Sequence, residues 1–166
     1  SIYEKDINLK ISKALEIELS QSGATVIMTR DDDYDLSKPN ARWRKKSDFD
    51  NRIKLINNSK ATIYLSIHLN YLTNDAYYGP QIFYAKEETK NLATMIQTTL
   101  NNKLNTNRQI KEIPKKTYMY NKLTIPGVLI ECGFLSNNEE KKKLVTEEYQ
   151  QKIASLIKDA IINYFN

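Results

Sequence analysis

The stretch TIYLSI at residues 62–67 is a near-continuous apolar run that ends at His68, and it decides the fold. A second run, VLI at residues 128–130, ends in the same way at Glu131. Short apolar runs of this kind are typical of strands that are buried on both faces of a parallel sheet. The two runs therefore predict two buried strands, each followed at once by a polar side chain.

The segments around these strands alternate between helical and strand-like patterns. Short β-branched or apolar stretches predict further strands at residues 25–28 and 81–84. Apolar residues recurring every three to four positions predict helices at residues 7–19 (ending at Gly23), 53–58, 92–104 and 149–164. This alternation predicts an α/β fold: one layered domain over residues 1–166, with a largely parallel or mixed central sheet flanked by helices.

The composition agrees with one globular domain and excludes several other classes of protein. A chain of 166 residues with 40% hydrophobic content can bury a sizeable core. No stretch approaches the roughly 20 apolar residues that a membrane helix needs, and no basic-then-apolar leader opens the sequence. A signal or anchor is therefore expected outside these residues. Cys132 is the only cysteine, which excludes an internal disulfide framework and a Cys-rich zinc cluster.

The formal net charge is +5, and much of the excess lies in residues 38–54 and 108–122. Two interpretations are open: attraction to a polyanion such as the bacterial wall or an anionic membrane, and a lysine-rich solvated face. Neither an aromatic-interleaved RNA motif nor zinc-finger spacing accompanies the charge. We therefore expect no nucleic-acid partner.

Three polar side chains are expected to meet at one edge of the sheet. His68, the only histidine, and Glu131 each follow a predicted strand. Functional groups gather at the carboxyl ends of parallel strands, and the amino-termini of the helices lie at the same edge. Glu4 is in the first turn of the first predicted helix, at capping-box spacing from Ser1, and so joins the other two.

One imidazole and two carboxylates suit a zinc ion, with one carboxylate left to act as a general base. Each residue also has a plainer interpretation. His68 can be a hydrogen-bonded strand end, and Glu4 can cap its helix. Glu131 is harder to explain in this way, because a carboxylate that follows three core residues is costly to bury without a partner. The pattern alone leaves both interpretations open.

At these residues the sequence resembles the zinc-dependent N-acetylmuramoyl-L-alanine amidases (the amidase_3 family), and the resemblance covers essentially the whole chain. The matching motifs are EKDINL at 4–9, TR at 29–30, SIHLN at 66–70, IECGFLSN at 130–137 and the closing helix at 153–165. The stretches VIMTR at 26–30 and LIN at 55–57 are most similar to the germination-specific, CwlD-type amidases, which modify spore-cortex peptidoglycan.

The resemblance implies that Glu4 and His68 are zinc ligands and that Glu131 is the catalytic glutamate. The implied reaction is hydrolysis of the amide between N-acetylmuramic acid and the L-alanine of the stem peptide in peptidoglycan. The family's third ligand is a histidine on the loop after the first strand. Both that strand and that loop are expected upstream of Ser1, so we expect these 166 residues alone to bind zinc poorly and to be nearly inactive.

The resemblance also implies an extracytoplasmic location, in the cell wall or in the intermembrane space and cortex of a spore. An alternative function is a catalytically incomplete, amidase-like module that binds peptidoglycan.

The exposed or buried state of several tyrosines is left open. Tyr71, Tyr77 and Tyr78 follow His68 and either stack on sugar rings or pack into the core or an interface. As exposed aromatics, Tyr77, Tyr78 and Tyr118 are candidates for a surface that binds a regulatory protein of unknown identity.

Overall fold

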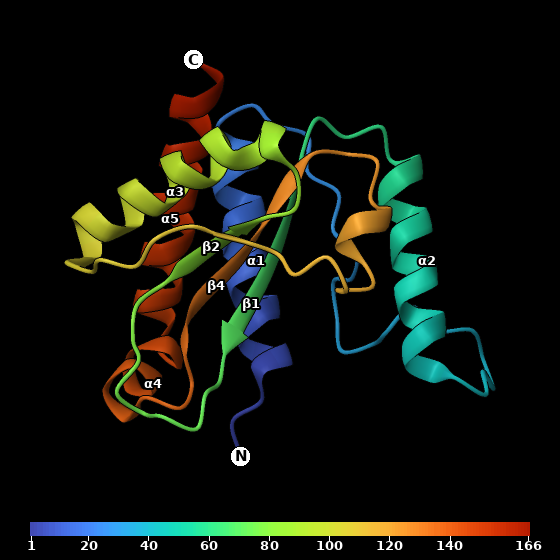
Figure 1. Ribbon diagram of the computed structural model, residues 1–166, viewed down its shortest axis with the longest axis horizontal. Coiled ribbons are helices and arrows are strands. Elements are labelled where there is room, and N and C mark those ends of the chain that lie inside the picture. The colour runs from blue at the N-terminus through green and yellow to red at the C-terminus, as the bar shows by residue number, and fades with distance from the viewer.

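The two apolar runs form neighbouring parallel strands at the centre of the protein. The computed structural model describes residues 1–166. Its four-stranded sheet has the order β1 (Tyr64–Asn70), β4 (Gly127–Phe134), β2 (Gln81–Tyr84) and β3 (Lys111–Glu112). β2 runs antiparallel to β4, and β3 runs parallel to β2. The sheet is therefore mixed, and the predicted single α/β domain is confirmed (Figure 1).

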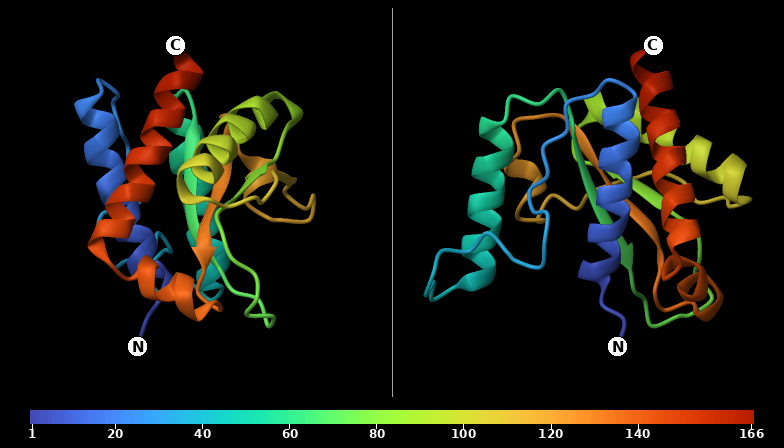
Figure 2. Two further views of the ribbon diagram at one scale, coloured as in Figure 1. Left: turned by 90° about the vertical axis from the view of Figure 1, so that its left-hand side faces the viewer. Right: turned by 180° about the vertical axis from the view of Figure 1, so that it is seen from behind.

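Helices cover both faces of the sheet. They are α1 (Glu4–Gln21), α2 (Arg44–Asn58), α3 (Lys90–Leu104), α4 (Asn138–Leu144) and α5 (Glu147–Phe165), with 3-10 turns η1 (Glu87–Thr89) and η2 (Tyr120–Lys122). The main core joins α1, α3 and α5 to one face, and a smaller cluster joins α2 and η2 to the other. Figure 2 shows α1 and α5 side by side on the first face. No helix has the length and apolar character that crossing a membrane requires.

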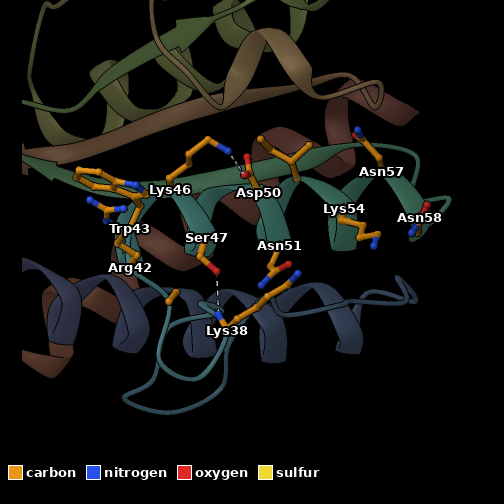
Figure 3. Close-up of a pocket in the computed structure, with 12 residues that line it drawn as sticks. Lys38, Arg42, Trp43, Lys46, Ser47, Asp50, Asn51, Lys54, Asn57 and Asn58 are labelled. Atoms are coloured by element: carbon orange, nitrogen blue, oxygen red, sulfur yellow. Dashed lines mark hydrogen bonds and ion pairs between the residues drawn. The ribbon is translucent and has the colours of Figure 1, made fainter.

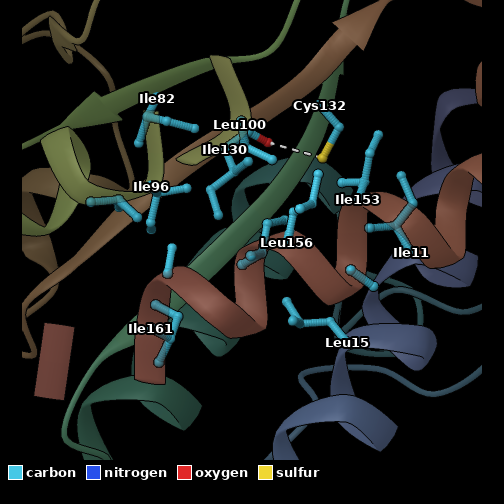
Figure 4. Close-up of a cluster of buried hydrophobic side chains, with 14 of the residues drawn as sticks. Ile11, Leu15, Ile82, Ile96, Leu100, Ile130, Cys132, Ile153, Leu156 and Ile161 are labelled. Atoms are coloured by element: carbon cyan, nitrogen blue, oxygen red, sulfur yellow. Dashed lines mark hydrogen bonds between the residues drawn. The ribbon is translucent and has the colours of Figure 1, made fainter. Parts of the chain in front are cut away.

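Strand alternation divides the side chains of β1 and β4 between the two faces. Leu65 and Ile67 of β1, with Val128 and Ile130 of β4, belong to the main core. Figure 4 shows this core between β4 and the helices, with Cys132 inside it. Cys132 is free and fully buried. The residues between these positions point to the other face, which is where His68 and Glu131 lie.

The expected strand at residues 25–28 is wrong, because this segment has no regular secondary structure. A β-branched stretch becomes a strand only when a neighbouring strand supplies hydrogen bonds, and no backbone–backbone hydrogen bond involves these residues. Val26 packs instead against the main core from an irregular segment.

The prediction that residues 62–67 are buried on both faces is also wrong. β1 lies at the edge of the sheet, and only Leu69 among its residues is fully buried. The strand begins at Tyr64 and continues through His68 to Asn70, and β4 likewise continues past Glu131. The two polar residues therefore lie within their strands rather than after them.

The capping box predicted from Ser1 and Glu4 does not form. Tyr3 is the N-cap of α1 and makes no side-chain capping bond, and Ser1 is exposed. The Glu4 carboxylate is instead held by α1 and β1, since its Oε1 accepts hydrogen bonds from Asn8 Nδ2 and from the Leu69 N–H.

Gly127 is required for the contact between β1 and β4. A Cβ atom at this position would lie 2.2 Å from the Tyr64 carbonyl oxygen and 2.4 Å from the Tyr64 ring. Because one of these atoms is backbone, rotation of the Tyr64 side chain does not relieve the overlap.

We expect Gly127→Ala to destabilise the protein by about 2–3 kcal/mol, since the strands must separate to admit the methyl group. Urea unfolding measures the change. Ser20→Ala on the exposed side of α1 is the control and should stay within about 0.5 kcal/mol of wild type. Equal unfolding midpoints for Gly127→Ala and wild type would contradict the close approach.

Candidate functional site

The structure brings together the three residues that the sequence singles out. In the β1–β4 register His68 lies directly opposite Glu131. Glu4 reaches them from the first turn of α1, and its Oε1 lies 3.1 Å from His68 Nδ1. The same oxygen accepts the N–H of Leu69 at 3.1 Å, which ties α1 to the edge strand. The expected meeting of helix start and strand ends is found, while the roles of the residues remain predictions.

The two carboxylates have different electrostatic environments. Partial burial works to raise the pKa of Glu4, but hydrogen bonds from His68, the Leu69 N–H and Asn8 outweigh it, and the pKa is lowered. Burial raises the pKa of Glu131 to about 7; the nearby His68 opposes this shift and Glu4 adds to it. Glu131 Oε2 is buried and has no hydrogen-bond partner. Glu4 is therefore suited to stay ionised, and Glu131 is suited to exchange a proton near neutral pH.

The donor types at the site fit a zinc ion. Ligands at about 2.0–2.1 Å in a tetrahedral site are about 3.3 Å from one another, close to the separation of Glu4 Oε1 and His68 Nδ1. The unsatisfied oxygen of Glu131 likewise indicates a polar partner at this place. The chain contains no cluster of three or more His, Cys, Asp or Glu side chains arranged to hold a metal. Glu4 and His68 thus offer donor types suited to two of the three protein ligands that a catalytic zinc usually takes.

The α2 side of the site contains a buried polar pair. The Tyr120 hydroxyl lies 3.0 Å from Ser66 Oγ, two residues before His68 on the same face of β1. Burial raises the pKa of Tyr120 to about 12, so the phenol stays protonated beside the carboxylates. Arg52 of α2 is paired with Asp48 at 3.0 Å and is mostly buried. On this side of the site Arg52 is therefore paired with an acid, while its buried Nε has no hydrogen-bond partner.

Glu140 is a buried carboxylate that the sequence interpretation missed. It is 7% exposed, and its oxygens accept the N–H groups of Gly79 and Phe134. A Cβ on Gly133 would lie 2.9 Å from this carboxylate, so the glycine makes room for it. Asn137 is the N-cap of α4, and its side chain accepts the Glu140 N–H. The position of Glu140 three residues after this N-cap is the only signal of Glu140 in the sequence. Glu140 fixes the end of β4 against the loop that leads to β2.

The tyrosines after His68 are exposed, so the interpretation that they pack into the core is wrong. The exposed fractions are 72% for Tyr71, 44% for Tyr77 and 52% for Tyr78. Tyr118 differs, because it is half-buried between Phe49 of α2 and Lys122, and its hydroxyl bonds to Asp50. Tyr118 is therefore not part of an exposed aromatic surface.

A groove along α2 lies away from these three residues. It has a volume of about 700 Å³ and follows α2 from Trp43 to Asn58 (Figure 3). Neither Glu4, His68 nor Glu131 lines it. Its basic side chains belong to the first of the two basic groups of the sequence, and both interpretations of that charge stay open.

Comparison with known proteins points to one family. The family described as N-acetylmuramoyl-L-alanine amidase matches residues 1–163. The germination-specific N-acetylmuramoyl-L-alanine amidase of Bacillus subtilis is 41% identical over 170 residues, which cover 99% of this chain and 71% of that protein.

Solved structures agree with the sequence comparison. The CwlD amidase from Clostridioides difficile, in complex with the GerS lipoprotein, matches with a TM-score of 0.93 and 41% identity, over 99% of this chain and 87% of that chain. The catalytic domain of CwlV, an N-acetylmuramoyl-L-alanine amidase from Bacillus (Paenibacillus) polymyxa var. colistinus, matches with a TM-score of 0.83 and 30% identity, over 98% and 85% of the two chains.

The burial of Glu131 predicts a pH-dependent stability in the metal-free protein. Its folded pKa of about 7 lies above the ordinary value of 4.5, so the folded state holds the proton more tightly than the unfolded state. Stability is then lost as the pH rises through this window. We expect Glu131→Gln to be more stable than wild type by about 3 kcal/mol at pH 8, with the difference shrinking towards pH 4.

Urea unfolding of both metal-free proteins between pH 4 and 8 measures this difference. If the free energies of unfolding of wild type and Glu131→Gln differed by the same amount at every pH, the Glu131 carboxyl would be solvated and the prediction contradicted.

Proposed function

We propose, on the premise that this chain belongs to the N-acetylmuramoyl-L-alanine amidase family, that Glu131 is its catalytic base and that Glu4 and His68 are zinc ligands. The chain is a peptidoglycan hydrolase of the cell wall, which cleaves the amide between N-acetylmuramic acid and L-alanine. The observation that carries the residue assignment is the strand register, which sets His68 beside Glu131 and within reach of Glu4.

Glu131 performs the proton transfers in this proposal. When bound, zinc supplies a Lewis acid for the scissile carbonyl and lowers the pKa of the attacking water towards about 7. Glu131 takes a proton from that water as the new C–O bond forms. It then delivers the proton to the amide nitrogen as the C–N bond breaks, because an unprotonated amide nitrogen is a poor leaving group. In the metal-free protein, burial raises the pKa of the Glu131 carboxyl to about 7, which favours its taking up a proton.

Glu4 and His68 act together as the metal-holding pair. Asn8 Nδ2 and the Leu69 N–H both donate to Glu4 Oε1, which fixes the carboxylate before any ion binds. His68 is fixed by its place on β1. Such supporting bonds reduce the entropy that the ligands lose when the metal binds. The third ligand is proposed to come from outside these 166 residues.

The alternative of a catalytically incomplete wall-binding module is not favoured. Two of the matched relatives are named as amidases, and Glu131 is retained with a buried, unsatisfied oxygen. A module that only binds peptidoglycan has no use for that costly arrangement.

The finer role is proposed to be modification of spore-cortex peptidoglycan, outside the cytoplasm. Support comes from the B. subtilis relative, which is named as germination-specific. We also propose a regulatory protein partner, since the C. difficile CwlD amidase was solved in complex with the GerS lipoprotein. An enzyme that cuts the wall of its own cell requires restraint, and the exposed Tyr77 and Tyr78 offer aromatic contact area for such a partner.

We expect Glu131→Ala in the full-length protein to keep its zinc and to lose turnover by about 10²–10⁴-fold, the usual contribution of a general base. Release of L-alanine-terminated peptides from purified peptidoglycan measures the rate, and metal analysis measures the zinc. Cleavage at the wild-type rate would remove Glu131 from the mechanism.

We expect His68→Ala to lose most of the bound zinc, because one imidazole ligand is removed while Glu4 remains. The metal content of the purified full-length protein, determined by mass spectrometry, measures this loss. Tyr71→Ala, which changes an exposed side chain three residues away, is the control and should keep its zinc. Full zinc occupancy in His68→Ala would contradict the ligand assignment.

A further inference from the structure

A third strand extends the row of side chains formed by His68 and Glu131. In the antiparallel β2–β4 pairing, Gln81 lies directly opposite Glu131. Paired residues on neighbouring strands point to the same face and lie about 5 Å apart. Gln81 is only 5% exposed, so its polar side chain needs partners inside the protein. The row across β1, β4 and β2 therefore leads from the proposed zinc ligands, past the base, to a buried amide.

Arg108 is the partner of Gln81 and is held in one orientation. Its Nε and Nη2 both donate to Gln81 Oε1, at 3.2 and 3.0 Å. Its guanidinium lies 4.9 Å from the ring centroid of Phe134 and 5.6 Å from that of Tyr77. The side chain of Asn101 fixes the backbone by donating to the Arg108 carbonyl at 2.8 Å. The guanidinium is thus oriented by aromatic stacking and by a neutral acceptor.

The charge of Arg108 is not neutralised. None of the ion pairs in the protein includes Arg108. Burial raises the pKa of Glu140, and the charge of the nearby Arg108 opposes this shift less than the N–H groups of Gly79 and Phe134, which the Glu140 oxygens already accept. A guanidinium has five N–H donors, and Gln81 accepts only two of them. The remaining donors and the full charge suit a carboxylate ligand.

We propose that Arg108 is a substrate-binding residue that recognises the free carboxylate of the second residue of the stem peptide, D-glutamate. This inference rests on the proposed function and names a contact with its substrate. The scissile amide lies next to Glu131, and two peptide residues span about 7 Å. A carboxylate bound by Arg108 lies within roughly 10 Å of Glu131, given strands about 5 Å apart and one hydrogen-bonded side chain between them. The first free carboxylate after the scissile bond therefore reaches the guanidinium.

A purely structural role for Arg108 makes a different prediction. Arg108 joins the segment after α3 to β2 and to the end of β4, so its loss disturbs packing whatever the substrate carries. Recognition of a carboxylate instead acts only on substrates that bear one. The test is a comparison of two substrates that differ in that group alone.

The experiment uses the zinc-loaded full-length protein and a defined muramyl tetrasaccharide with either L-alanyl-D-glutamate or neutral L-alanyl-D-isoglutamine stems. We expect wild type to prefer the acidic substrate in kcat/KM by at least about tenfold, the size of a charge-assisted hydrogen bond. Arg108→Gln should bring this ratio close to one. Arg108→Lys should give an intermediate ratio, because lysine keeps the charge but not the planar fork.

Arg42→Gln is the matched control, since it removes one arginine charge from the α2 groove, and it should keep the wild-type ratio. A wild-type ratio near one, or an equal loss on both substrates in Arg108→Gln, would overturn the carboxylate contact and leave the amidase function standing. Failure of wild type to cleave either substrate would contradict the proposed function itself.

Discussion

The parallel hydrogen-bonded register between β1 and β4 is the constraint on which the rest of the protein depends. It requires Gly127, whose missing side chain lets the strand approach Tyr64. Once that pairing is set, the register brings His68 opposite Glu131. Because successive side chains of a strand point to opposite faces, Ile67 and Ile130 pack into the main core and His68 and Glu131 lie on the opposite face. The pairing of β1 with β4 therefore both stabilises the fold and positions His68 and Glu131.

Two carboxylates on and beside β4, Glu140 buried and Glu131 half-buried, differ in how their oxygens are satisfied. Glu140 is satisfied by two backbone N–H groups and holds the strand end in place. Glu131 has an oxygen with no partner, and burial, with a smaller contribution from the charge of Glu4, raises its pKa towards neutrality. An unsatisfied buried acid destabilises a protein, so it persists where a ligand or a reaction compensates for it. The contrast supports Glu131 as the base in a member of the amidase family.

The two sides of the site differ in how their arginine side chains are held. Towards α2 the half-buried Arg52 is already paired with Asp48. Towards β2 the cation Arg108 is oriented by aromatic rings and a glutamine and makes no ion pair, while the nearby Glu140 already accepts two backbone N–H groups. The substrate proposed for this chain carries carboxylates on its peptide, and Arg108 is proposed to bind one of them.

The sequence alone determined the features that depend on local residue patterns, namely the main helices, the two central strands and the motif residues. Helical periodicity located α1, α3 and α5, the apolar runs located β1 and β4, and motif resemblance identified Glu4, His68 and Glu131. Only the tertiary structure decided which groups pair. A β-branched stretch at residues 25–28 found no strand to bond with, and Glu4 bonded to β1 instead of closing a capping box. Gln81, Arg108 and Glu140 were missed because each is defined by a partner that is distant in sequence or by burial, and periodicity carries no information about either.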